Sequence, residues 1–129
     1  MKTIGHVKCK SLGEAFCIFV EVGASHAKEP TSVEISRLLG GTQKESFRWE
    51  RITWICQIAY GKAIRKNPNI NLQISIKRDA LVLLVDKHGY KVIMYRATEG
   101  WRVTITTLPH CDEAEAIKAL RKAESALTS

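Results

Sequence analysis

Hydrophobic and polar residues alternate along much of the second half of the chain. Between Asn69 and Leu108, apolar residues recur at every second position, which is the period of a β-strand. Short polar or glycine-containing links divide this region. The pattern therefore predicts four consecutive strands in an antiparallel meander. We expect the strands at 70–77, 80–85, 90–96 and 101–107.

The N-terminal region is also predicted to form strands. Residues 3–10 and 15–22 are two apolar-rich segments, joined by the turn-forming residues 11–14. In the second segment both alternating sets are largely apolar, which predicts a strand covered on both sides. We therefore expect a hairpin at the start of the chain.

Three segments carry the spacing of a capping box, in which Ser, Thr or Asp is followed three residues later by Glu. The first predicts a helix that ends at Gly40-Gly41, and the second predicts a long helix that ends at Lys66, before Asn67-Pro68. Apolar residues cover much of the circumference of this long helix, so we expect it to be buried. The third predicts a C-terminal helix. The boxes are Thr31–Glu34, Thr42–Glu45 and Asp112–Glu115.

These elements predict a two-layer α+β fold, an antiparallel β-meander with helices packed on it, in the order ββααββββα. The 129 residues fit a single domain, 1–129, and 45% of them are hydrophobic, as in an ordinary globule. Apolar runs are too short to cross a bilayer. Because Glu21 interrupts the apolar stretch near the N-terminus, a signal peptide is disfavoured, and we expect a cytoplasmic protein.

The two helices expected at 31–66 resemble a helix-turn-helix over about twenty residues. A glycine-containing turn precedes a helix that starts near Gln43, as in the repressors that read the major groove. Ser46 and Gly41 depart from that pattern, and the second helix is much longer than a recognition helix. An ordinary pair of helices packed on the sheet is the favoured interpretation, and no family membership is inferred.

The net charge indicates which class of partner the protein could bind. Twenty Lys and Arg against 13 Asp and Glu leave a formal net charge of +7. Basic residues share one face near the start of the long helix and gather again at its end, where the helix dipole also favours them. Together with a preceding arginine they form a candidate nucleic-acid surface, which would bind phosphates. Its residues are Arg37, Lys44, Arg48, Arg51, Lys62, Arg65 and Lys66.

The polar face of the sheet is a second candidate surface. It should present Lys77 from one strand and Arg102, Thr104 and Thr106 from another. Single-stranded nucleic acid binds such faces when aromatic rings are interleaved, but Tyr90 and Tyr95 should lie on opposite faces of their strand. A solvated face is therefore the favoured interpretation.

Catalytic and metal-binding patterns are not apparent. The four histidines occur in separate segments. His110-Cys111-Asp112 contains the residue types of a thiol triad, but adjacent side chains diverge and Asp112 is the expected cap of the last helix, so a triad is disfavoured. We expect no cofactor and no metal site. The four cysteines lack a CxxC spacing and are expected to be mostly buried thiols, although Cys9 and Cys17 could pair across the expected hairpin.

Three hypotheses about the function follow from these features. The leading hypothesis is a small, non-catalytic nucleic-acid-binding protein that acts through its basic helix face and loops. The alternative is an interaction or inhibitor module that binds an acidic protein. A third is a small-ligand binder with a cavity lined by Trp49, Trp54, Tyr60 and Trp101. The amphipathic strand at 70–77 could also pair across a homodimer axis.

Overall fold

The computed structural model describes residues 2–24, 48–66, 70–75, 79–85, 88–109 and 112–128, and the elements below lie in these ranges. Five strands and three helices follow in the order βααββββα, an α+β architecture. They are β1 (Lys2–Cys9), α1 (Leu12–Ala24), α3 (Trp49–Lys66), β2 (Ile70–Ser75), β3 (Ala80–Val85), β4 (Tyr90–Ala97), β5 (Gly100–Thr107) and α4 (Glu113–Thr128).

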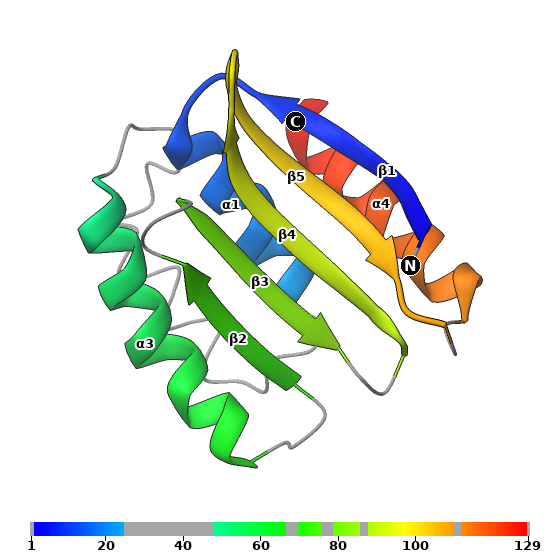
Figure 1. Ribbon diagram of the computed structural model, residues 1–129, viewed down its shortest axis with the longest axis horizontal. Helices are drawn as coiled ribbons and strands as arrows, with labels where there is room; N and C mark the ends of the chain where they lie inside the picture. Colours follow the sequence, from blue (N-terminus) through cyan, green and yellow to red (C-terminus); the bar gives the residue numbers. More distant parts are fainter. Residues whose placement is uncertain are drawn as a thin grey trace.

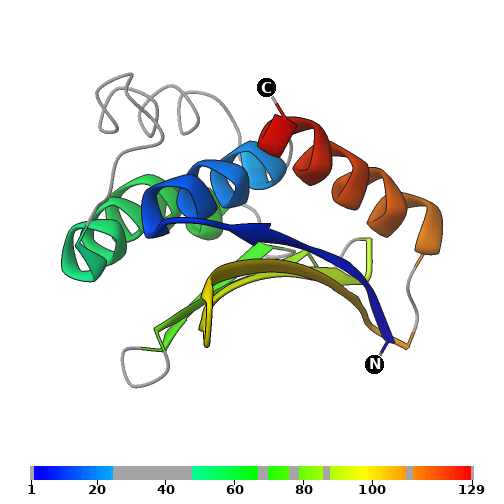
Figure 2. The same ribbon diagram turned by 90° about the horizontal axis from the view of Figure 1, so that it is seen from above.

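The five strands form one antiparallel sheet in the order β1-β5-β4-β3-β2 (Figure 1). Strands β2 to β5 are the meander expected from the alternating pattern, and β1 pairs with β5 at the far end. A bulge between Thr3 and Gly5 shifts the register of β1. All three helices lie on the same side of the curved sheet, so the strands have a helix-covered face and an open face (Figure 2).

The expected second strand at 15–22 is wrong, because these residues belong to helix α1. Ser11 caps that helix: its hydroxyl accepts a hydrogen bond from the Glu14 backbone N–H at 3.1 Å, and the Glu14 carboxylate accepts one from the Lys10 N–H at 3.2 Å. Ser11-Leu12-Gly13-Glu14 is thus a fourth capping box rather than a turn. A helix buried on most sides has the same uninterrupted apolar composition as a buried strand, so the period alone was ambiguous.

The core lies between the sheet and the helices. Helix α1 occupies its centre, with Phe16 and Phe19 fully buried and in contact with the inward residues of the strands. Alternate strand residues face this layer, as the pattern predicted, and α4 closes it with a row of alanines. The buried hydrophobic strand residues are Val7, Cys9, Leu81, Leu83, Val85, Tyr90, Val92, Met94, Trp101, Val103 and Ile105.

Helix α3 lies beside the edge strand β2 and is not the buried centre of the fold (Figure 1). Its residues Ile52, Ile55 and Cys56 are buried, but Trp54 is 54% exposed. The start of the helix is attached to the sheet by an aromatic pair: Trp49 stacks on Trp101 with ring centroids 5.9 Å apart and planes inclined by 20°. The predicted burial of this helix is therefore confirmed for the face with Ile52, Ile55 and Cys56 and wrong for the face with Trp54.

Helix α4 begins where the sequence predicted. Asp112 accepts a hydrogen bond from the Ala114 N–H at 3.1 Å through its carboxylate, which confirms this cap. Cys9 and Cys17 are not joined in a disulfide, so the pairing that the expected hairpin left open is not made. The reason is that Cys17 lies on a helix, and the hairpin does not exist.

Candidate interaction surfaces

The predicted basic helix surface is only partly described. Arg37 and Lys44 lie outside the described residues, as do residues 31–47 with the resemblance to a helix-turn-helix. Arg48, Arg51 and Arg65 are exposed, and Lys62 and Lys66 lie on α3, although their side chains are not described. Arg51 and Arg65 are separated by about 21 Å along the helix axis. The described arginines of α3 therefore lie in two groups, one near each end of the helix.

Between these two groups, α3 presents uncharged residues. Trp54 and the half-buried Ile58 lie on the solvent side of the helix, one turn apart, and Glu50 precedes them by one turn. This mixed surface differs from the row of phosphate contacts that duplex binding requires. Nucleic-acid binding through α3 therefore stays a prediction.

The open face of the sheet has a more distinctive charge pattern. The strands β1 to β5 contain no Asp or Glu, but they contain five Lys or Arg residues. Two of the five are neutralised: Lys2 lies 3.5 Å from the carboxylate of Glu113, and Arg96 lies 2.9 Å from that of Asp79. Lys8, Lys91 and Arg102 form no ion pair within the described ranges.

These three unpaired cations all belong to the open face. Lys8 pairs in register with Arg102, and Arg102 pairs with Tyr95, whereas the neighbours of Arg102 in its own strand, Trp101 and Val103, are buried on the helix side. Lys91 follows on β4, four residues before Tyr95, or about 13 Å along the strand. The sequence placed Arg102 on this face correctly. Lys77 lies outside the described residues.

An aliphatic patch adjoins the cations. Val82 and Ile93 are register partners, and Leu84 pairs with Lys91. The side chains of Val82, Leu84, Ile93 and Tyr95 are half-buried, and no described helix covers them, because α1, α3 and α4 lie on the opposite side (Figure 2). The open face is therefore apolar over β3 and the middle of β4. Its cations are Lys91 at the start of β4, Arg102 on β5 and Lys8 on β1.

Two threonines that were expected to be exposed on this face are buried. Thr104 and Thr106 are only 8% and 7% exposed, and they lie on β5, which is flanked by β1 and β4. The hydroxyl of Thr104 donates a long hydrogen bond of 3.5 Å to the Tyr95 hydroxyl. Tyr95 on β4 and the exposed His6 on β1 are the aromatic rings among the described strand residues of this face, since Tyr90 and Trp101 face the helices.

The residues named for the expected aromatic cavity are described only in part. Trp49 and Trp101 stack directly on each other, and the Arg96 guanidinium lies over the Trp101 ring at 5.1 Å from its centroid. Trp54 is exposed, and the side chain of Tyr60 is not described. The stacked rings of Trp49 and Trp101 therefore attach α3 to the sheet.

Groups with catalytic or metal-binding potential do not gather in the described parts of the chain. No cluster of three His, Cys, Asp or Glu residues that could hold a metal ion occurs there. Burial raises the pKa of the Cys56 thiol to about 12. Burial and the nearby Glu14 carboxylate raise that of Cys9 to about 11. Both are poor nucleophiles at neutral pH. His110 and Cys111 lie outside the described residues.

Comparison with known proteins adds no relative. No protein family model, no curated protein and no solved structure matches this chain. Among the described helices, none is long and apolar enough to span a membrane.

Proposed function

We propose that this protein is a non-catalytic interaction module that binds an acidic segment of a partner protein on the open face of its sheet. The observation that carries the proposal is the position of the unpaired cations. Of the five basic residues in the strands, the two outside this face are neutralised, whereas Lys8, Lys91 and Arg102 on it form no ion pair with any residue that the structure describes. A carboxylate-rich partner would supply the missing counter-charges.

The aliphatic patch favours a protein over a nucleic acid. Specific protein interfaces combine an apolar centre with a polar or charged rim. Val82, Leu84 and Ile93 provide such a centre beside the cations. Sequence-tolerant binding of single strands needs several rings on which successive bases stack, and among its described residues this face offers only Tyr95 and the smaller His6 ring, on strands separated by β5. The half-buried aliphatic side chains gain more from contact with leucine or valine side chains than from phosphates.

A titration with three fluorescent probes tests the proposal. The first is an acidic peptide of alternating Glu and Leu, about eight residues long to match β4 and β5. The second replaces every Glu with Lys, and the third is oligothymidylate of similar contour length. We expect anisotropy to show binding of the acidic peptide about tenfold or more tighter than the other two, weakening as salt is added.

Two results would overturn the proposal. Tighter binding of oligothymidylate than of the acidic peptide would assign the face to nucleic acid. Equal binding of the acidic and basic peptides would show that the apolar patch acts without the cations.

A further inference from the structure

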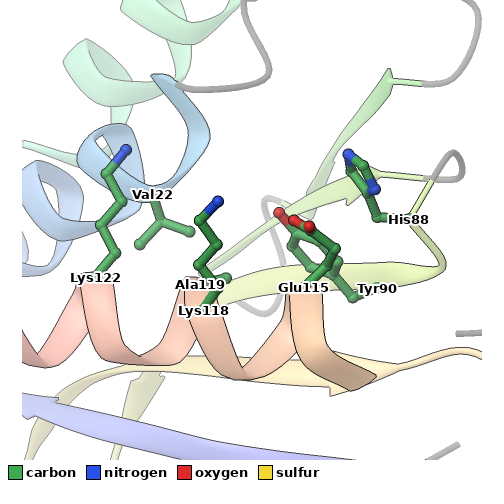
Figure 3. Close-up of a pocket in the computed structure, with 7 residues that line it drawn as sticks. All are labelled: Val22, His88, Tyr90, Glu115, Lys118, Ala119 and Lys122. Atoms are coloured by element: carbon green, nitrogen blue, oxygen red, sulfur yellow. The ribbon is translucent and has the colours of Figure 1, made fainter. Parts of the chain in front are cut away.

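A pocket lies on the helix-covered side of the molecule, separate from the open face of the sheet. It has a volume of about 320 Å³ and opens between α4, the last turn of α1 and the start of β4 (Figure 3). This volume lies at the lower end of the range for small-molecule sites. The lining residues are Val22, His88, Tyr90, Glu115, Lys118, Ala119 and Lys122.

The floor of the pocket is apolar and rigid. Val22, Tyr90 and Ala119 are buried and come from three different elements. The His88 ring stacks on the Tyr90 ring with centroids 6.2 Å apart and planes inclined by 19°, which gives one wall a flat surface. A planar or short aliphatic group would therefore be desolvated on this floor without rearrangement of the core.

The rim of the pocket is charged. Lys118 and Lys122 lie one turn apart on the same side of α4, and Glu115 lies one turn before Lys118 (Figure 3). Neither lysine forms an ion pair within 4.0 Å in the described ranges, although Glu115 is close enough along the helix to reach Lys118. Two like charges one turn apart repel each other, and an anion between them would relieve that repulsion.

We infer that this pocket binds a small organic anion, a carboxylate or a phosphate monoester carried on a compact apolar body. The anionic group lies between the ammonium groups of Lys118 and Lys122, and the body lies over Val22 and Ala119 against the His88 ring. Glu115 is directed toward the His88 and Tyr90 end of the pocket and accepts a hydrogen bond from a hydroxyl or N–H group of the ligand (Figure 3). This inference does not depend on the proposed function of the sheet.

Calorimetric titration with four probes tests this inference. Benzoate and phenyl phosphate represent the two anion types, 4-hydroxybenzoate adds a donor for Glu115, and benzyl alcohol is the neutral control. We expect at least one anion to bind with a Kd of about 1 mM or tighter, and benzyl alcohol to bind about tenfold more weakly. The ratio of the benzoate and phenyl phosphate affinities identifies the preferred anion.

Charge-matched variants locate the site. Lys118→Gln and Lys122→Gln should each weaken anion binding about tenfold, whereas Arg121→Gln, which removes an exposed cation of the same helix outside the pocket, should leave it unchanged. Glu115→Gln should strengthen benzoate binding by removing a repelling carboxylate.

Three outcomes would overturn the inference. They are no binding of any anion at about 10 mM, equal binding of benzyl alcohol and benzoate, and equal loss of binding in the Arg121 and lysine variants.

Discussion

Tyr95 and Arg102 are register partners across the β4–β5 pair, and they join the apolar and basic halves of the open face. Arg102 also neighbours Lys8 on β1, and Tyr95 neighbours Ala80 on β3. A partner chain lying across the strands would contact the aliphatic patch and the cations together. The helices α1, α3 and α4 lie on the opposite side of the curved sheet (Figure 2).

The cap of α1 makes a stability prediction. Ser11→Ala removes the acceptor of the Glu14 N–H and should lower the free energy of unfolding by about 1 kcal/mol. Ser11→Thr retains a hydroxyl and should lower the free energy of unfolding only slightly. Urea denaturation of the three proteins measures the difference. Equal stability of Ser11→Ala and the wild type would show that the cap does not stabilise the helix.

Two glycines predict opposite effects of the same substitution. A Cβ at Gly5 would lie 2.6 Å from a methyl group of Leu120, whereas a Cβ at Gly61 would have no neighbour within 4 Å. Gly5→Ala should therefore destabilise the protein by about 1 kcal/mol or more, because the Leu120 side chain must move. Gly61→Ala should stabilise it by up to about 1 kcal/mol, because alanine favours the helix. Thermal unfolding midpoints that shift in the same direction would contradict this pair.

The tryptophans should contribute unequally to stability. Trp101 is buried and stacks on Trp49, so Trp101→Ala should cost about 3 kcal/mol or more. Trp54 is 54% exposed, and Trp54→Ala should change the free energy of unfolding by less than about 0.5 kcal/mol. Chemical denaturation distinguishes the two. A large loss for Trp54→Ala would mean that α3 packs more tightly than described.

The buried Cys56 thiol should make the protein less stable at alkaline pH. Burial raises its pKa from 9.0 to about 12, so between these values the unfolded chain loses the thiol proton while the folded chain keeps it. The unfolded state therefore binds fewer protons, and the free energy of unfolding falls as the pH rises above 9, by up to about 1.4 kcal/mol per pH unit. Below pH 9 the thiol is protonated in both states, so Cys56 causes no change of stability with pH there. Cys56→Ala should show a shallower decline between pH 9 and 11 in urea denaturation, and an identical decline would contradict the assignment.

The meander could be predicted because its signals are local. Each strand from β2 to β5 has its own alternation, and the links at Gly89 and Gly100 contain glycines with positive φ, of 74° and 110°. By contrast, α1 could not be separated from a strand by period, because almost every residue in it is apolar. The Ser11 to Glu14 spacing was the available signal, and it matches the spacing that correctly predicted the start of α4.

The composition of the open face could be predicted only in part. Alternation along 90–96 already separates Lys91, Ile93 and Tyr95 from the buried residues, so these positions could have been added to Arg102. The neighbour of Arg102 could not be predicted. Lys8 reaches it because β1 pairs with β5 across more than ninety positions of sequence, and no short-range pattern encodes that pairing.

The affinity of the acidic peptide for a charge-reversed open face tests the central claim most directly. We predict that Lys91→Glu combined with Arg102→Glu weakens binding about tenfold or more, while circular dichroism shows an intact fold. A control that reverses two exposed cations elsewhere, Arg65→Glu with Arg121→Glu, has the same net charge and should bind within about twofold of the wild type. Equal losses in the two double variants, or no loss in the first, would contradict the account.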